Sequence, residues 1–278
     1  MFFSGIADEA GEPIDVQIRA HKELGWQHIE IRNVDKVNLT VVCDEVFDDV
    51  VRKLDAAGLK VSCFAGQLCN WSRPVSKHPD IDRQELARAI PRMKRLGCRF
   101  IRTMSYPNAG WPEHKWRDTV VARLKVLAAM AEEAGVVLVH ENCDGWGAES
   151  AANMLELIEK VGSAALKVVW DTGNSVPHGL DPWSFYTAVR DHVVYVHIKD
   201  DKMADGRTVY TYPGEGAGRV RDVIADLLGR GYDGGLSIEP HLAAVVHEGK
   251  SADRAETPYR VYVEYGRRLM NLVEQIRG

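Results

Sequence analysis

The chain of 278 residues lacks the features that would assign it to a membrane or to nucleic acid. No apolar run approaches the ~20 residues of a membrane-spanning helix. No long run of Lys or Arg occurs, and the formal net charge of −5 disfavours a polyanionic partner such as a phosphate backbone. We therefore expect a protein that binds neither membranes nor nucleic acids.

Cysteine is scarce as well. The five cysteines form no Cys-x-x-Cys pair, and their spacing fits neither a zinc knuckle nor a disulfide framework. The N-terminus, Met-Phe-Phe-Ser-Gly-Ile-Ala-Asp-Glu, contains no basic residue and soon reaches two acids, unlike a signal peptide. These absences predict reduced thiols and a cytoplasmic location.

What the sequence does contain is a regular alternation of short apolar runs with longer amphipathic segments. Several of these segments end at a glycine, the residue that most often terminates a helix (Gly25, Gly58, Gly97, Gly135 and Gly231). Strands that alternate with helices form parallel βαβ units, and eight such units predict an α/β fold of the (β/α)8 TIM barrel type, typically of ~250 residues. No GxGxxG motif follows a strand, so a dinucleotide-binding fold has no support. We expect one domain over residues 1–278.

The connections that follow strands are long, whereas those that follow helices are short. Barrels carry their catalytic residues at the C-terminal ends of the strands, so the long connections indicate a functional face there. They are Gly66–Asp82, Ser105–Lys115, Lys199–Gly218 and Pro240–Pro258. The expected strands are Phe2–Ala7, His28–Arg32, Lys60–Phe64, Phe100–Met104, Val136–Glu141, Leu166–Asp171, Val193–Lys199 and Gly235–Glu239. The expected helices are Val16–Leu24, Val46–Ala57, Gln84–Leu96, Trp116–Ala134, Ala151–Val161, Trp183–Val189, Val220–Arg230 and Tyr259–Arg277.

The last four of these strands end with a residue that can bind a metal: Glu141, Asp171, His197 and Glu239. A charged group at the end of an apolar strand costs free energy to desolvate unless it is paired or coordinated. Any one of them alone is explained as well by a cap, an ion pair or a core histidine. On consecutive strands of a barrel, however, they converge at one rim. Three carboxylates and one imidazole suit a divalent cation such as Mn²⁺, Mg²⁺, Co²⁺ or Zn²⁺.

Short motifs at the strand ends carry a further indication. They are His-Glu-Asn (140–142), Trp-Asp-Thr-Gly-Asn (170–174), Val-His-Ile-Lys-Asp (196–200), Pro-Gly-Glu-Gly (213–216) and Ser-Ile-Glu-Pro-His (237–241). With them, and from Gly5-Ile-Ala-Asp-Glu9 onward, the chain resembles the sugar phosphate isomerase/epimerase family of xylose isomerase-like barrels. That family includes ketose 3-epimerases, hydroxypyruvate isomerases, inosose dehydratases and a zinc endonuclease of abasic-site repair.

The resemblance implies that Glu141, Asp171, His197 and Glu239 are metal ligands and that Glu141 and Glu239 are also the acid/base pair. In this chemistry the metal chelates a carbonyl and a neighbouring hydroxyl of a small keto-sugar or polyol-derived substrate and stabilises an enediolate. The two carboxylates remove and return the α-proton. Mn²⁺ is the preferred cation, before Mg²⁺, Co²⁺ or Zn²⁺. A homo-oligomer is left open.

The chain departs from the epimerase pattern at one position after the metal-binding aspartate, where Asn174 replaces a histidine. An arginine that epimerases carry after the metal-binding histidine has no clear equivalent. These departures keep open a metal-dependent lyase, either a dehydratase or a 3-keto-glycoside eliminase, that uses the same chemistry. The endonuclease function needs more histidines and a basic groove, and a non-catalytic barrel would not be expected to retain the ligand set.

Residues outside the ligand set are candidates for substrate contacts. Lys199 shares the inward direction of His197 and can bind a carboxylate, phosphate or enolate oxygen. Tryptophan rings in the long loops can pack against a sugar, although packing of a lid explains them as well. The candidates are Lys199, Asn174, His241, Arg102 and Trp111.

Two further expectations concern charge. Glu30 and Arg32 share one face of the second strand, and we expect an ion pair between them beneath the site. No glycine-rich anion cradle is evident, which favours an unphosphorylated substrate.

Overall fold

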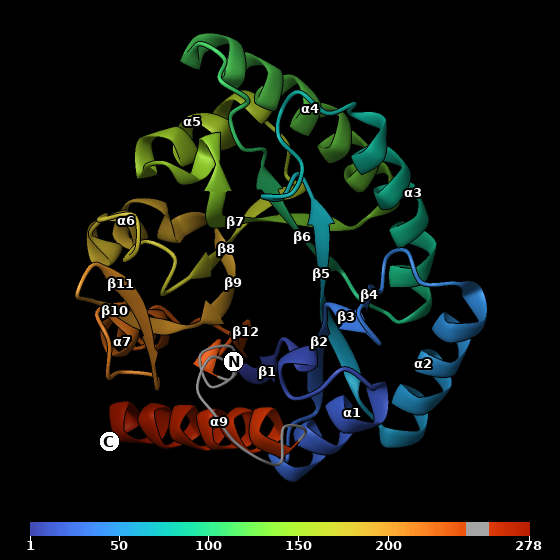
Figure 1. The fold of residues 1–278 in the computed structure, drawn as a ribbon, viewed down its shortest axis with the longest axis vertical. Helices are drawn as coiled ribbons and strands as arrows, with labels where there is room; N and C mark the ends of the chain where they lie inside the picture. The colour runs from blue at the N-terminus through green and yellow to red at the C-terminus, as the bar shows by residue number, and fades with distance from the viewer. Residues whose placement is uncertain (243–255) are drawn as a thin grey trace.

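The computed structural model describes residues 1–242 and 256–278, and eight parallel strands form its centre (Figure 1). Their order is β1-β12-β9-β8-β7-β6-β5-β2. A parallel bridge between Ile6 and Glu30 joins the two edges of this sheet and closes the barrel. All eight predicted strands are confirmed, as β1 (Phe2–Gly5), β2 (His28–Ile31), β5 (Lys60–Leu68), β6 (Phe100–Ser105), β7 (Val137–Gly145), β8 (Leu166–Asp171), β9 (Val193–Ile198) and β12 (Gly235–Ile238).

The helices form a ring outside the barrel (Figure 1). The five glycines expected to end helices all have φ between 63° and 73°, a conformation that side chains with a Cβ rarely adopt. Six helices begin one to four residues earlier than the apolar spacing predicts, and four of them carry acids in the first turn, which favour a helix N-terminus. The helices are α1 (Ile14–Glu23), α2 (Asp44–Ala57), α3 (Asp80–Arg95), α4 (Glu113–Ala134), α5 (Ala151–Val161), α6 (Pro182–Val189), α7 (Val220–Gly229) and α9 (Glu256–Arg277).

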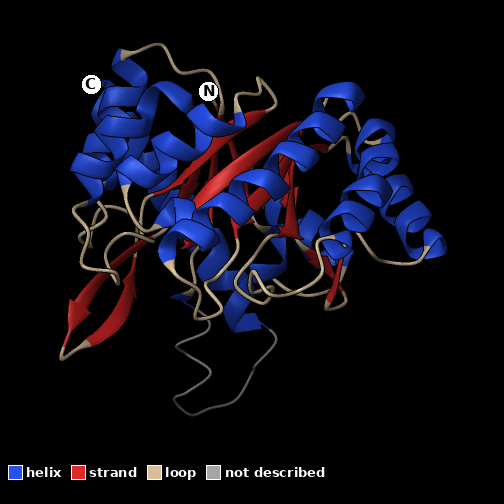
Figure 2. Cartoon of the chain, turned by 90° about the horizontal axis from the view of Figure 1, so that it is seen from above, coloured by secondary structure: helices blue, strands red, loops and turns tan. Residues whose placement is uncertain are grey.

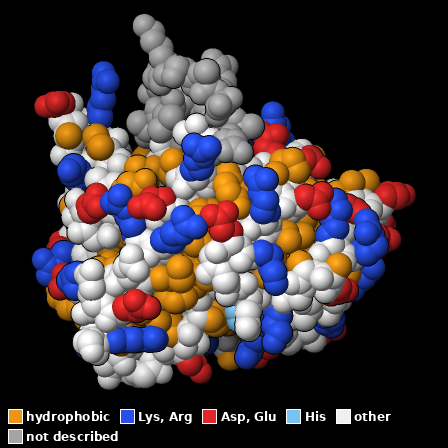
Figure 3. All heavy atoms as spheres, turned by 90° about the horizontal axis from the view of Figure 1, so that it is seen from below, with side chains coloured by type: hydrophobic (Ala, Val, Ile, Leu, Met, Phe, Trp, Pro, Cys, Tyr) orange, Lys and Arg blue, Asp and Glu red, His pale blue; other side chains and the backbone are white. Residues whose placement is uncertain are grey.

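The outer surface is mixed in charge. On the face shown in Figure 3, basic and acidic side chains are interspersed, with apolar side chains between them. Among the helices of the described residues, none combines the length and the hydropathy that crossing a bilayer requires.

Alternation along the strands decides which side chains enter the barrel. In β7, Val137 and Val139 belong to an apolar cluster inside the barrel, whereas Leu138 packs in the layer beneath the helices. The same alternation in β9 places Tyr195 inside and Val196 outside. Residues two positions further along, Glu141 at the end of the pairing between β7 and β8 and His197 near the end of β9, therefore point into the barrel mouth. Because side chains alternate between the two faces of a strand, these residues face one another inside the barrel.

Two short hairpins occur in segments where no strand was predicted. They are β3 (Asn33–Val34) with β4 (Val37–Asn38), and β10 (Asp200–Ala204) with β11 (Arg207–Thr211). The second one projects from the end of the barrel (Figure 2), and its turn residues Asp205 and Gly206 both have positive φ, as a tight hairpin turn requires. Sequence alternation does not reveal this hairpin because its outer residues are largely exposed on both faces. The predicted loop 240–258 lies mostly outside the described residues.

Candidate metal and active site

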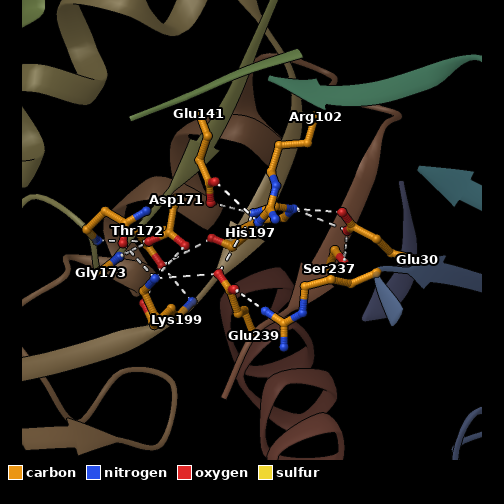
Figure 4. A network of polar contacts seen from close by, with 12 residues as sticks. Glu30, Arg102, Glu141, Asp171, Thr172, Gly173, His197, Lys199, Ser237 and Glu239 are labelled. Carbon is orange, nitrogen blue, oxygen red and sulfur yellow. Dashed lines mark hydrogen bonds and ion pairs between the residues drawn. The ribbon is translucent and has the colours of Figure 1, made fainter. Parts of the chain in front are cut away.

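The four predicted ligand residues meet at the C-terminal end of the barrel (Figure 4). Glu141 lies in β7, Asp171 ends β8, His197 lies in β9 and Glu239 directly follows β12. Each offers one ligand atom, and these atoms all lie within 4.8 Å of one another. All four side chains are buried, Glu239 most exposed at 4%. The predicted convergence of these side chains is therefore present in the structure.

The donor atoms of this cluster fit a divalent cation. His197 Nδ1 lies 3.0 Å from Glu141 Oε1 and 4.0 Å from Glu239 Oε2. Two buried carboxylate oxygens, Glu141 Oε2 and Asp171 Oδ2, accept no hydrogen bond within the described part of the chain. Arg102 lies 3.4 Å from the first of these oxygens and Lys199 3.1 Å from the second, and a divalent cation between them would further offset the cost of burying both carboxylates. Oxygen and imidazole donors together suit Mn²⁺, Mg²⁺, Co²⁺ or Zn²⁺.

The other ring nitrogen of His197 faces a carboxylate deeper in the barrel. His197 Nε2 lies 3.1 Å from both oxygens of Glu30, and Ser237 Oγ donates to Glu30 Oε2 at 2.6 Å. Burial alone would lower the pKa of His197, but Glu30 and Glu141 outweigh it and raise the pKa well above its usual value. A carboxylate behind a ligand histidine is a common arrangement: it keeps the nitrogen that faces the carboxylate, here Nε2, protonated and leaves the other, here Nδ1, for a metal.

The expected ion pair between Glu30 and Arg32 is not what the structure shows. Glu30 contacts His197 and Ser237, whereas Arg32 forms ion pairs with Asp8, Glu9 and Glu239 at the rim of the barrel. The reason is geometric, because residues two apart on a strand are separated by nearly 7 Å along it and lie in different layers. The alternation of side chains along the strand predicts their common face but does not encode their different depths.

The Glu30→Gln variant tests the support of His197. We expect its metal affinity to fall by about 10- to 100-fold, because the amide cannot hold the imidazole N–H as a carboxylate does. Metal titration by calorimetry measures this effect. Glu274→Gln, an exposed substitution in α9 with the same charge change, is the control. Unchanged affinity in a folded Glu30→Gln protein would remove Glu30 from the metal site.

Lys199 lies against the cluster. Its Nζ is 3.1 Å from Asp171 Oδ2 and 3.5 Å from Glu239 Oε2, and it donates to Asn174 Oδ1 at 2.6 Å. Burial opposes the charged lysine, but these carboxylates outweigh burial and raise its pKa well above the usual value. Gly173 is required beside it, because a Cβ there would lie 2.8 Å from an oxygen of Asp201. Lys199 therefore stays a cation within the site.

Asp171 is held in one orientation by the backbone that follows it. Its Oδ1 accepts the N–H groups of Gly173 and Asn174, both at 2.8 Å, which leaves Oδ2 directed at the cluster. The Asn142 side chain bonds both the N–H and the C=O of Asp171 and so fixes the end of β8. Burial raises the pKa of Asp171 to about 6, although the charge of Lys199 opposes the shift.

Both glutamates are held in the ionised form by neighbouring cations. Burial opposes ionisation of Glu141, yet Arg102, whose guanidinium lies 3.4 Å away, and then His197 lower its pKa below the usual value. Burial also opposes ionisation of Glu239, and the charges of Lys199, His241, His197 and Arg32 lower its pKa well below the usual value. A carboxylate can remove a proton only in this ionised form.

A pocket of about 490 Å³ opens over the cluster. Of the four ligand residues, only Glu141 and Glu239 line it, whereas Asp171 and His197 do not. Four predicted substrate residues, Lys199, Asn174, His241 and Arg102, also line it. The remaining lining residues are Arg32, Asn33, Gln67, Asn70, Trp71, Met104, Cys143 and Tyr210. Most of these polar and aromatic positions were not predicted individually. The sequence indicated them only through the length of the loops that follow strands.

Trp111 is the one predicted substrate-contact residue that the structure places elsewhere. It does not line this pocket; its ring lies under Lys115, whose Nζ is 4.0 Å from the ring centroid near the start of α4. Trp71, on the preceding long loop, is the tryptophan at the pocket. The sequence shows which loops carry tryptophan but not the direction in which each loop turns. A larger hollow of about 590 Å³ between α3 and α4 contains none of the four ligand residues.

Comparison with known proteins agrees with the fold. The model of the xylose isomerase-like TIM barrel family matches residues 18–258. The chain belongs to this family. The predicted resemblance and the predicted barrel are thereby confirmed, and we refer below to a xylose isomerase-like barrel.

Curated relatives of this xylose isomerase-like barrel are enzymes of two classes. A 2-epi-5-epi-valiolone 7-phosphate 2-epimerase of Actinoplanes sp. is 29% identical over 176 residues, 63% of this chain and 62% of that protein. An inosose dehydratase of Geobacillus kaustophilus is 26% identical over 142 residues, 46% of each chain. The matches thus span less than two thirds of either relative's length. Among solved structures, the IOLI protein with a bound zinc atom has 16% identity and a TM-score of 0.76, with 99% of each chain covered, which shows a shared fold.

Proposed function

We propose that this xylose isomerase-like barrel is a divalent-metal-dependent isomerase or epimerase of a small keto-sugar or polyol-derived substrate. The observation that supports this proposal most directly is that the four residues of the cluster differ in their access to the pocket. All four residues can reach one cation, yet only Glu141 and Glu239 face the pocket. Asp171 and His197 would hold the metal from behind, while the two glutamates are also placed to exchange protons with a bound substrate.

The site residues suit proton transfer next to a carbonyl. When bound, the metal supplies Lewis-acid stabilisation of the negative charge that develops as an α-proton leaves. Glu141 and Glu239, both ionised, accept that proton from either side of the substrate. Return of a proton from the Glu239 side needs an acid, and the protonated groups of Lys199 and His241, 3.5 and 3.7 Å from Glu239, can supply it. Mn²⁺ is the cation we propose first, with Mg²⁺, Co²⁺ or Zn²⁺ as alternatives.

A lyase is the second candidate, and two observations favour it. The matched relatives include inosose dehydratases, and Asn174 stands where the epimerases have a histidine. Asn174 instead accepts a hydrogen bond from Lys199, which keeps that ammonium group over the cluster. An ammonium group in this position could protonate a departing hydroxyl, as elimination of water requires.

Turnover of a keto-sugar and inosose panel in D₂O distinguishes the two reactions. For an isomerase or epimerase we expect solvent deuterium at the α-carbon with the carbon skeleton and all oxygens retained, as observed by NMR and mass spectrometry. Loss of water or of an aglycone would instead establish the lyase. Absence of both exchange and elimination with every metal in the protein would contradict the proposed function.

A further inference from the structure

A second hollow lies beside the catalytic pocket, and proton transfer alone does not require it. Its volume is about 400 Å³, and it lies between the connection from β7 to α5 and the connection from β8 to α6. Cys143 lines both this hollow and the catalytic pocket, so the two adjoin at that residue. We call it the annex; its lining residues are Cys143, Asp144, Gly145, Ala148, Glu149, His178 and Leu180.

One wall of the annex is built by fixed backbone. Gly145 has a φ of 95°, and a Cβ there would lie 2.3 Å from the carbonyl carbon of Ser105. Its N–H donates to Asp144 Oδ1 at 2.6 Å, and the N–H of Gly147 donates to Ser105 Oγ at 2.9 Å. Because these contacts close the turn after β7, the annex exists before any ligand arrives.

The annex is acidic. Asp144 and Glu149 both line it, and the charges that act on Glu149 within the described residues are those of other carboxylates. Burial first, and then the charges of Glu113 and Asp144, raise the pKa of Glu149. Such a rise is expected where carboxylates lie together without a compensating cation. Apart from His178, the titratable side chains that line the annex within the described residues are these carboxylates and the Cys143 thiol, so the annex offers hydrogen-bond acceptors and disfavours anions.

The catalytic pocket does not compensate for this charge. Each basic side chain that lines it within the described residues already faces a carboxylate, so the pocket holds no unpaired cation for a phosphate group there. Arg32 pairs with Asp8, Glu9 and Glu239; Arg102 with Glu141; Lys199 with Asp171 and Glu239; and His241 with Glu9.

We propose that the annex is a subsite for a second, uncharged, polyhydroxylated group of the substrate, such as the second sugar unit of a glycoside, and that it disfavours a phosphate ester there. This inference rests on the proposed function, because it extends the same pocket. Sugar hydroxyls donate hydrogen bonds to carboxylates, whereas a phosphate dianion can only accept and is repelled. The reacting ketose would occupy the catalytic pocket, and the second unit would pass Cys143 into the annex.

Three probes that share one ketose test this proposal. They are D-fructose, D-fructose 6-phosphate and isomaltulose, which is fructose with a glucosyl group on O6. We expect calorimetric titration of the Mn²⁺-loaded protein to show isomaltulose binding about tenfold more tightly than D-fructose, as one or two added hydrogen bonds allow. D-fructose 6-phosphate should bind about tenfold more weakly than D-fructose, because of repulsion by the acidic annex.

Two variants attribute these differences to the annex. In Asp144→Asn/Glu149→Gln the disadvantage of D-fructose 6-phosphate should disappear, while an amide oxygen at position 144 can still accept the N–H of Gly145. In Leu180→Trp the larger side chain should fill the annex and remove the advantage of isomaltulose without changing the affinity for D-fructose. Glu159→Gln, on the exposed face of α5, is the charge control. Thermal unfolding establishes that each variant is folded.

The outcomes separate this inference from the function on which it rests. If D-fructose binds but isomaltulose gains nothing, or if D-fructose 6-phosphate binds most tightly, the annex proposal is overturned while the keto-sugar function stands. If D-fructose itself does not bind the metal-loaded protein, the proposed function is overturned and the annex proposal with it.

Discussion

Replacement of Glu239 by Gln is expected to lower kcat by about 10²- to 10⁴-fold, the contribution typical of a positioned acid or base. The change keeps the size of the side chain but removes the charge that faces Lys199 and Arg32, 3.5 and 3.2 Å away. Glu141→Gln should have an effect of the same order, because Glu141 is the other ligand residue that lines the pocket. Steady-state rates at saturating metal, with substrates identified by the D₂O panel, measure both.

The metal content of each variant must be measured together with its kcat, because both glutamates are also proposed ligands. A variant that binds metal normally and has lost turnover supports proton transfer by that residue, whereas loss of the metal as well shows that the residue is needed for coordination. Glu274→Gln controls for the change in net charge. Near-normal kcat in either folded variant excludes that glutamate from proton transfer.

Much of the fold and the convergence of the cluster could be predicted because they follow from local regularities. Apolar runs separated by glycine-terminated helices specify parallel βαβ units, and parallel strands bring their C-terminal ends to one rim. Glu141 and His197 then meet because each faces inward at the same rim of the barrel. Only the period of the pattern and the direction of the strands enter this reasoning.

The contacts that were not predicted depend on depth and on loop direction, which the pattern does not encode. Glu30 and His197 are distant in sequence, and they meet because Glu30 is one layer below the rim while Arg32 is at it. Trp71 enters the pocket and Trp111 does not, although both belong to long loops after strands. Three-dimensional packing of the loops determines such positions.

The site is balanced in charge by its own basic residues, and this affects how the protein should respond to a metal. Asp171 and Glu239 contact Lys199, and Glu141 contacts Arg102. Because these pairs partly compensate the buried carboxylates, the barrel should remain folded when the metal is removed. A bound cation should therefore raise stability rather than create the fold.

Removal of the metal by a chelator is expected to abolish turnover and to lower the unfolding temperature without unfolding the protein. Readdition of Mn²⁺ at 1,000 times its Kd should stabilise the folded state by about 4 kcal/mol, because the metal binds the folded chain in preference to the unfolded one. Differential scanning calorimetry of the chelated and reconstituted protein measures this shift, and elemental analysis measures the bound metal.

Asp171→Asn should remove most of that stabilisation. The asparagine amide oxygen can still accept the N–H groups of Gly173 and Asn174, so the turn after β8 is kept while the carboxylate that faces the cluster is lost. Asp118→Asn, on the exposed surface of α4, should respond to Mn²⁺ as the unaltered protein does. If the unaltered protein binds no metal and its unfolding temperature does not change when Mn²⁺ is added, the cluster is not a metal site. A full Mn²⁺ response in Asp171→Asn would instead remove Asp171 from the ligand set, because the remaining three residues would then suffice.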